Sequence, residues 1–122
     1  MKKKILILED ELLIAKMYSL LFEKEGFIVS VSDHAKDIGN LVNRFEPDYI
    51  IMDNYLKNKE SGFEAASKLR KMGIETPIVF TTGGAENVTR DFSDKLSNSS
   101  YMIKPIEGKE LLLFIMTRLQ LV

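Results

Sequence analysis

The apolar residues of this chain form two kinds of pattern that alternate along it. Short continuous runs occupy residues 5–8, 27–31, 49–53, 77–81 and 101–103. Continuous runs of this length are typical of strands that are covered on both faces, as in a parallel sheet. Between the runs, apolar residues recur every three or four positions, which predicts helices at 12–24, between 33 and 47, and at 62–72, 86–100 and 109–121.

Strands that alternate with helices in this way predict a parallel sheet with helices on both faces. Ser32 or Asp33 is expected to cap the second helix. The segment 86–100 has only a narrow apolar stripe among Ser, Asn and Asp residues that compete for the backbone, so this helix should be the weakest. The apolar stripes of the predicted helices are Leu13, Met17, Leu20 and Leu21; Ile38, Leu41, Val42 and Phe45; Phe63, Ala66, Leu69 and Met72; Val88, Phe92 and Leu96; and Leu111, Leu112, Ile115 and Leu119.

Polar residues stand where the predicted strands end. In open α/β sheets, ligands bind in the crevice beyond the carboxyl ends of the strands. We therefore expect the strand-end residues to form one site. They are Glu9 and Asp10 after the first strand, Asp53 at the end of the third, Thr82 and Gly83 after the fourth, and Lys104 after the fifth.

Glu9, Asp10 and Asp53 would bring three carboxylates together at this edge. Converging carboxylates repel each other, and a hard divalent cation with oxygen ligands relieves the repulsion. Mg²⁺ is the natural ion for such a site, bound by Asp10 and Asp53 and, through water, by Glu9. The sequence therefore predicts a magnesium site.

The same edge provides the groups that a phosphoryl transfer needs. Asp53 is deprotonated without a general base, which makes it a candidate nucleophile, and the metal would neutralise charge on the arriving phosphoryl group. Lys104 would pair with one phosphoryl oxygen, while the Thr82 hydroxyl and the Gly83 amide would donate hydrogen bonds to the others.

The composition excludes several classes of protein. The 122 residues suit a single domain, residues 1–122, and 45% hydrophobic residues, 29% charged residues and a net charge of -1 fit neither a disordered tail nor a nucleic-acid binder. No cysteine is present, so a metal must be held by oxygen. The longest apolar run, 111–116, is far shorter than the ~20 residues of a membrane span. We expect a cytoplasmic protein that binds neither nucleic acid nor membrane.

The strand-end residues, in this order, resemble the receiver domain of two-component response regulators, and the resemblance runs from Lys3 to Leu119. It implies a flavodoxin-like, doubly wound, five-stranded parallel sheet of order 2-1-3-4-5, similar to chemotaxis regulators, with helices on both faces. Glu9 and Asp10 match the acidic pair of the family, and Asp53 matches its phosphorylated aspartate.

The resemblance also assigns the remaining site residues. Thr82 matches the hydroxyl that ends the fourth strand, and Lys104 matches the lysine of the family, with a cis peptide bond between Lys104 and Pro105. Tyr55 would offer its backbone carbonyl to the metal. Tyr101 matches the aromatic switch position.

The implied function is a phosphoacceptor switch. Asp53 would receive its phosphoryl group from the phosphohistidine of a histidine kinase or a phosphotransfer protein, with Mg²⁺ as cofactor. Thr82 would then move toward the phosphate and Tyr101 would turn inward, which repacks the surface of the fourth helix, fifth strand and fifth helix. That surface would contact a downstream protein or a second copy, and the fourth helix should be its mobile part. Such a domain is regulatory and catalyses only its own phosphorylation and dephosphorylation.

Several residues depart from the family pattern. Lys57 replaces the usual proline four residues after Asp53, and Gly62 comes one residue later than in the commonest spacing. Residues 98–100, Asn-Ser-Ser, replace the usual Gly-Ala before the switch aromatic. Gly84 replaces a larger residue, which leaves access to the acyl phosphate open.

The last helix carries apolar residues outside its buried stripe, namely Leu113, Phe114 and Leu121. They favour contact with a partner or a second copy. Cover by neighbouring elements or by a following domain explains them equally well.

Three other functions fit parts of the pattern. A receiver that no longer accepts phosphate would act only as a docking module, but every motif position is filled. A Mg²⁺-dependent phosphohydrolase of the haloacid-dehalogenase type needs a second aspartate where this chain has Tyr55. A flavin or nucleotide binder needs a phosphate-cradling loop after the first strand, where residues 9–11 are acidic.

Overall fold

The computed structural model describes residues 2–57, 60–83 and 96–122. It contains a five-stranded parallel sheet of order β2-β1-β3-β6-β7, in which β6 and β7 are the fourth and fifth strands, so the predicted order 2-1-3-4-5 is confirmed. The elements are β1 (Lys4–Leu8), α1 (Leu12–Lys24), β2 (Ile28–Ser32), α2 (Ile38–Phe45), β3 (Tyr49–Asp53), β4 (Tyr55–Leu56), β5 (Glu60–Ser61), α3 (Gly62–Lys71), β6 (Ile78–Thr82), β7 (Ser99–Ile103) and α5 (Gly108–Arg118).

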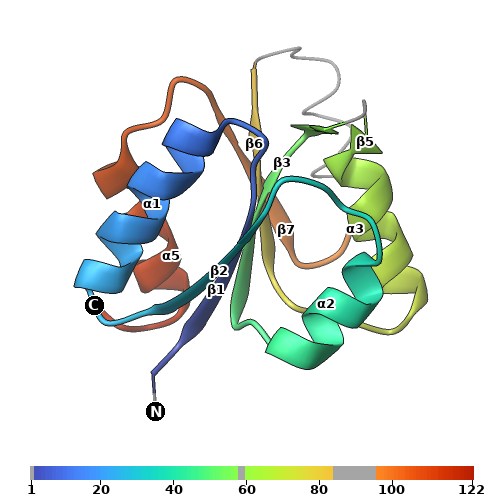
Figure 1. The fold of residues 1–122 in the computed structure, drawn as a ribbon. Coiled ribbons are helices and arrows are strands. Elements are labelled where there is room, and N and C mark those ends of the chain that lie inside the picture. Colours follow the sequence, from blue (N-terminus) through green and yellow to red (C-terminus); the bar gives the residue numbers. More distant parts are fainter. Residues whose placement is uncertain (1, 58–59, 84–95) are drawn as a thin grey trace.

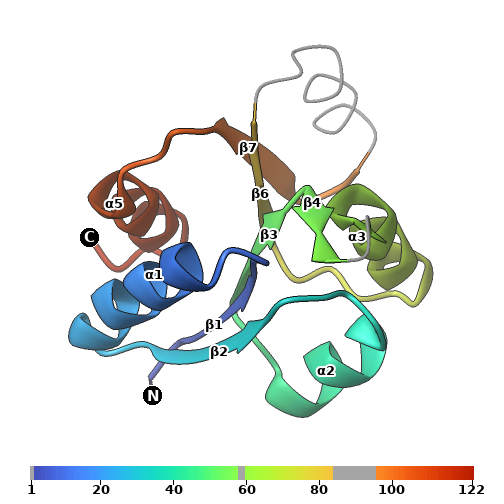
Figure 2. The ribbon, with the colours of Figure 1, turned by 45° about the horizontal axis from the view of Figure 1, so that its top comes forward.

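Helices cover both faces of the sheet. α1 and α5 lie on one face and α2 and α3 on the other (Figures 1 and 2). Each face has its own core, because successive side chains of a strand point to opposite sides. Thus Ile5 and Ile51 pack toward α1 and α5, while Leu6 and Ile50 pack toward α2 and α3. Burial on both faces is the reason why β1, β3 and β6 appear in the sequence as apolar runs. The edge strands β2 and β7 are partly exposed.

The central strand β3 is buried along its whole length. It pairs with β1 on one side and with β6 on the other, and the last pair on the β6 side joins Asp53 to Thr81. The position of Asp53 is therefore fixed by the core of the sheet rather than by a surface loop.

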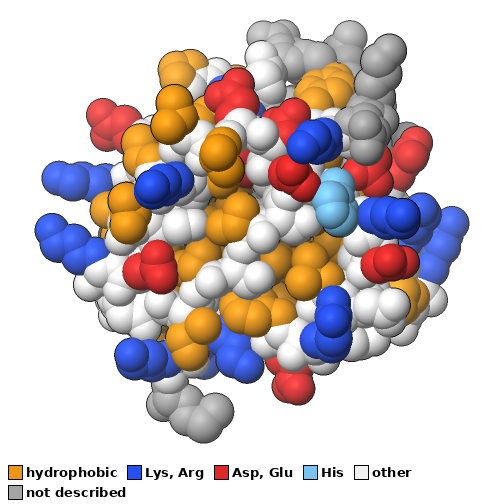
Figure 3. All heavy atoms as spheres, viewed as in Figure 1, with side chains coloured by type: hydrophobic (Ala, Val, Ile, Leu, Met, Phe, Trp, Pro, Cys, Tyr) orange, Lys and Arg blue, Asp and Glu red, His pale blue; other side chains and the backbone are white. Residues whose placement is uncertain are grey.

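Helix α1 has the predicted bounds, but of the four apolar residues that predict its buried stripe only Leu21 packs against the core. Leu13, Met17 and Leu20 are 83%, 51% and 60% exposed. The buried residues are Ala15, Tyr18 and Phe22, and Phe22 packs edge-on against Phe27 with 5.4 Å between ring centroids. The aromatic rings bury more surface than the leucines would, which leaves apolar side chains exposed over α1 (Figure 3).

The start of α2 also differs from the prediction. α2 begins at Ile38, and neither Ser32 nor Asp33 is its N-cap. The N-cap is Asp37, which has a φ of 56° and makes no side-chain capping bond. The Ser32 hydroxyl instead donates a hydrogen bond to the carbonyl of His34 at 2.8 Å, so it stabilises the loop before the helix.

Two other expectations about helices need correction. Met72 is more than half exposed and lies at the C-cap of α3, where the helix no longer faces the core. Ser99 and Ser100 belong to β7 and not to the predicted helix at 86–100. The greater part of that helix, with Val88 and Phe92, and also Gly84, lies outside the described residues.

The turn into β7 is held by two side chains, that of Asn98 in the turn and that of Arg70 near the C-terminal end of α3. Asn98 has a φ of 52°, a conformation that asparagine tolerates better than most residues. Its side-chain amide donates to the carbonyl of Glu75 at 2.7 Å. Arg70 donates to the carbonyls of Asn98 and Thr76 at 3.2 and 2.9 Å. These contacts hold Asn98 in a conformation that glycine would adopt more easily.

Within the described residues, no helix is long and apolar enough to span a bilayer.

The left-handed residue at the end of α2 gives a test of the fold. Glu46 has a φ of 54° at the C-cap, where a side chain is unfavourable and glycine is not. Glu46→Gly should raise the free energy of unfolding by about 0.5–1 kcal/mol in a urea titration. Glu25→Gly is the matched control, since Glu25 is the C-cap of α1 with a φ of -87°. If both substitutions destabilise the protein equally, the described geometry at Glu46 is wrong.

Candidate functional site

The predicted acidic residues meet at the carboxyl edge of the sheet. Glu9 and Asp10 follow β1, and Asp53 ends the neighbouring strand β3. Each of the three offers a carboxylate oxygen, and these oxygens lie within 4.8 Å of one another. Glu9 and Asp53 are buried, at 2% and 4% exposure, while Asp10 is exposed. The three acids thus form one cluster that is open to solvent on the side of Asp10.

Asp53 is held by two groups that also belong to the predicted site. Its Oδ2 atom accepts a hydrogen bond from Lys104 Nζ at 3.1 Å, and its Oδ1 atom accepts one from the backbone N–H of Tyr55 at 3.1 Å. Lys104 Nζ also lies 3.6 Å from Glu9 Oε1. The ammonium group of Lys104 therefore forms ion pairs with two buried carboxylates.

The electrostatics of Lys104 follow from these contacts. Burial opposes its charge, but the hydrogen bond to Asp53 and the negative charges of Asp53 and Glu9 outweigh burial and raise the pKa of Lys104 above its ordinary value. Lys104 is consequently a fixed positive charge at the edge of the site.

Glu9 is the least satisfied member of the cluster. Burial, and then the neighbouring carboxyl of Asp53, raise the pKa of Glu9 from 4.5 to about 8. Its Oε2 atom accepts a hydrogen bond from the backbone of Glu11 at 3.2 Å. Its buried Oε1 atom accepts no hydrogen bond from any described residue. A carboxylate oxygen in this position lacks a positive partner at hydrogen-bonding distance.

These observations test whether the donor set suits a metal ion. The cluster offers only oxygen donors, it carries an excess of negative charge over the single ammonium of Lys104, and Glu9 has an unpartnered oxygen. Hard divalent cations such as Mg²⁺ prefer such donors. The residues therefore fit the ion that the resemblance implies.

The remaining predicted site residues lie on β6 and β7 or directly after them. Thr82 is buried at the end of β6, and its carbonyl accepts a hydrogen bond from the backbone N–H of Lys104 at 2.7 Å. Gly83 is exposed beside it. The peptide bond between Lys104 and Pro105 is cis. Tyr101, at the middle of β7, is 37% exposed and does not lie buried behind Thr82.

The segment after Asp53 contains a small antiparallel hairpin. β4 pairs with β5 through Tyr55 with Ser61 and Leu56 with Glu60. The buried Leu56 side chain joins the core beneath α2 and α3 and anchors β4 to it. Ser61 accepts a hydrogen bond from the Glu64 N–H and caps α3.

The hairpin brings Gly62 against the backbone of Asp53. A Cβ atom added to Gly62 would lie 2.3 Å from the carbonyl oxygen of Asp53 and 2.7 Å from Met52 Cγ. The N–H of Gly62 donates to the carbonyl of Asn54 at 2.9 Å. The glycine at the start of α3 therefore packs directly on the end of β3.

A cavity of about 470 Å³ adjoins the acidic cluster. Glu9, Asp10 and Leu12 line one side of it, and Asp33 and Lys57 line the other. Neither Asp33, which is expected only as a helix cap, nor Lys57, which departs from the family pattern, is predicted as a residue of the site. The two residues carry opposite charges, but nothing in the sequence shows that their loops meet.

Gly62 provides a test of the site's backbone. Gly62→Ala should lower the free energy of unfolding by about 1–3 kcal/mol, because the added methyl group overlaps the Asp53 carbonyl. Gly83→Ala is the control, since a Cβ atom there meets no described atom within 4 Å. Urea titrations of both variants measure the difference. Equal stabilities would contradict the close contact at Gly62.

The raised pKa of Glu9 predicts how the metal-free protein responds to pH. The folded state keeps a proton on Glu9 that the unfolded chain releases above 4.5, so this proton stabilises the fold at low pH and the contribution disappears as pH rises through about 8. In EDTA, the free energy of unfolding should fall over that interval, and the fall should be smaller in Glu9→Gln. Glu25→Gln should retain the wild-type slope. A Glu9→Gln variant with the full slope would refute this assignment.

Comparisons with known proteins agree with this geometry. Residues 5–116 match the response regulator receiver domain family. An uncharacterized transcriptional regulatory protein of Bacillus subtilis (strain 168), YbdJ, is 31% identical over 114 residues, which are 90% of this chain and 48% of that protein. The chain thus spans about half the length of this curated relative.

Solved structures show the same fold. A CheY-like response regulator receiver domain protein from Methanospirillum hungatei JF-1 has a TM-score of 0.88 and 24% identity, covering 98% of this chain and 95% of that one. The chemotaxis protein CheY4 of Vibrio cholerae has a TM-score of 0.85 and 20% identity, covering 96% and 98%. Receivers are regulatory domains of two-component systems. Because the family match covers most of the chain, and the acidic cluster lies at the family's phosphorylation site, the chain belongs to the response regulator receiver domain family.

Proposed function

We propose that Asp53 accepts a phosphoryl group from the phosphohistidine of a histidine kinase or a phosphotransfer protein. The observation that carries this proposal is the environment of the Asp53 carboxylate. It lies in a cluster of carboxylate oxygens within 4.8 Å of one another and hydrogen-bonds to Lys104 at 3.1 Å. A nucleophile, a cation and a donor set for a second cation are thus concentrated at one edge of the sheet.

Mg²⁺ would be held by Glu9, Asp10, Asp53 and the backbone carbonyl of Tyr55. When bound, the ion supplies positive charge that offsets the mutual repulsion of the carboxylates and the charge of the incoming phosphoryl group. The β3 strand fixes the backbone of Asp53, and the Tyr55 N–H fixes its Oδ1 atom at 3.1 Å.

Phosphoryl transfer then needs little from the protein beyond position and charge. A carboxylate oxygen of Asp53 bonds to phosphorus while the bond between phosphorus and the donor's imidazole nitrogen breaks. Lys104 exchanges its contact with Asp53 Oδ2 for a phosphoryl oxygen. The hydroxyl of Thr82 and the N–H of Gly83 donate to the remaining oxygens. No group has to remove a proton from the nucleophile.

The phosphoryl group would act as a switch because it recruits these groups. It adds about -1.5 to -2 charges and supports one to three charge-assisted hydrogen bonds, each worth ~1.5–3 kcal/mol. Inverting a 1:99 equilibrium requires ~5.5 kcal/mol, so these contacts shift the population substantially. Thr82 would move toward the phosphate and the half-exposed Tyr101 would turn inward behind it.

The surfaces next to the site suit protein partners. On the donor side, the exposed Leu13 and Met17 of α1 continue from Leu12, which lines the cavity beside the acids. On the output side, Ile103 of β7 and Leu113 of α5 are exposed, and these elements would contact a downstream protein or a second copy. The fourth helix of that surface is outside the described residues.

The phosphoacceptor can be tested without knowing the partner. Incubation of the purified protein with acetyl phosphate and Mg²⁺ should add one phosphoryl group, detected by intact mass, and EDTA should prevent it. Asp53→Asn should gain none, because an amide is not a nucleophile of this kind. Asp37→Asn is the matched control, since Asp37 is exposed and lies at the N-cap of α2.

The possible results distinguish a phosphoacceptor switch from a docking module. A wild-type protein that remains unmodified would favour the docking module over the phosphoacceptor switch. Equal modification of Asp53→Asn and wild type would show that another residue accepts the phosphoryl group.

A further inference from the structure

We propose that the ion pair between Asp33 and Lys57 is a positioning device for the metal-binding segment that follows β3. Lys57 stands where the family usually has proline, so the segment requires another means of being held. This inference rests on the proposed function, because it concerns the metal that the acidic cluster would bind.

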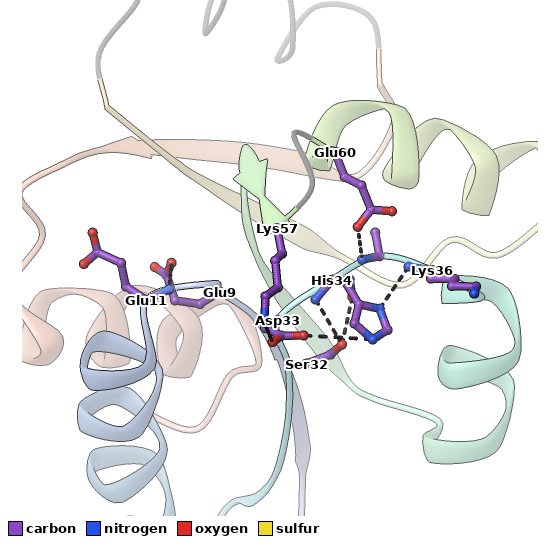
Figure 4. A network of polar contacts seen from close by, with 9 residues as sticks. Glu9, Glu11, Ser32, Asp33, His34, Lys36, Lys57 and Glu60 are labelled. Atoms are coloured by element: carbon purple, nitrogen blue, oxygen red, sulfur yellow. Dashed lines mark hydrogen bonds and ion pairs between the residues drawn. The ribbon is translucent and has the colours of Figure 1, made fainter.

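The segment after β3 is attached to the loop before α2 at three points. Lys57 Nζ lies 3.1 Å from Asp33 Oδ2, and the Lys57 N–H donates to the Asp33 carbonyl at 3.3 Å. On the other strand of the hairpin, Glu60 Oε1 accepts a hydrogen bond from the Ala35 N–H at 2.9 Å. Figure 4 shows Lys57 and Glu60 reaching from the hairpin to this loop.

These contacts lie close to the proposed metal ligands. Lys57 follows β4, whose first residue, Tyr55, donates its N–H to Asp53 Oδ1 and would offer its carbonyl to the metal. Asp33 and Lys57 also line the same cavity as Glu9 and Asp10. The ion pair therefore lies beside the acidic cluster and at the end of the segment that carries Tyr55.

The two side chains are well suited to this role. The hydrogen bond from Lys57 lowers the pKa of Asp33, so this carboxyl stays ionised at neutral pH. Both are partly exposed, at 63% for Lys57 and 45% for Asp33. Exposed pairs of this kind change equilibria by about two- to fivefold. The pair should therefore tune metal affinity without determining whether the domain folds.

A simple charge effect predicts a different result, which makes the proposal testable. If Lys57 acted only through its positive charge, its removal would strengthen the binding of a cation, whereas removal of Asp33 would weaken it. If the ion pair positions the segment, removal of either partner weakens binding. Lys57→Gln is consequently the decisive substitution.

The experiment is a Mg²⁺ titration of the unphosphorylated protein, followed by tyrosine fluorescence. Lys57→Gln and Asp33→Asn should each raise the Kd for Mg²⁺ about two- to fivefold, with melting temperatures near that of wild type. Lys57→Arg should retain wild-type affinity, and the exchanged pair Asp33→Lys with Lys57→Asp should recover most of the loss. Lys36→Gln is the charge-matched control, because Lys36 lies on the same loop and has no ion pair among the described residues.

Each outcome bears on the proposal. Weaker binding in both single variants and recovery in the exchanged pair support positioning. Unchanged or tighter binding by Lys57→Gln overturns it, as does a loss of the same size in Lys36→Gln. If wild type binds no Mg²⁺, the magnesium site of the proposed function fails together with this inference. If wild type binds Mg²⁺ but acetyl phosphate does not modify Asp53, the phosphoacceptor fails and the positioning role is still decided by the titration.

Discussion

The hydrogen-bonded ion pair between Lys104 and Asp53 is the interaction on which the site depends. Two carboxylates, Glu9 and Asp53, are buried at one edge of the sheet, and a buried charge without a partner is strongly destabilising. Lys104 is shared between them at 3.6 and 3.1 Å. Burial, and then the neighbouring carboxyl of Asp53, raise the pKa of Glu9, and the single ammonium group of Lys104 does not offset them. Under the proposed function, a cation would offset the charge of these carboxylates, and Lys104 would exchange its contact with Asp53 for one with a phosphoryl oxygen.

The strand that carries Asp53 is held more firmly than the loops beside the site. β3 is buried on both faces and is paired on both edges, so a displacement of Asp53 would disturb two cores at once. The hairpin after β3 and the loop before α2 are connected instead by exposed polar contacts, which are individually weak. Changes that follow metal binding or phosphorylation would therefore be absorbed by the loops and not by the sheet.

The sequence predicts the sheet and the acidic cluster for one reason. Strands buried on both faces appear as continuous apolar runs, and parallel strands place their carboxyl ends at the same edge. The buried face of α1 is not predicted, because Leu13, Met17 and Leu20 have nearly the same spacing as Ala15, Tyr18 and Phe22. The choice depends on partners such as Phe27 across the core. The contact between Asp33 and Lys57 is likewise not predictable from the sequence, because the two residues lie on separate loops that meet only in the folded protein.

Gly62 illustrates what a sequence motif measures. The glycine is required by its contact with the Asp53 carbonyl, where no side chain fits. β4 and β5 return the chain to the end of β3, so the first residue of α3 lies against the last residue of the strand. The glycine of the motif therefore records a contact in space between two elements and not a distance along the sequence.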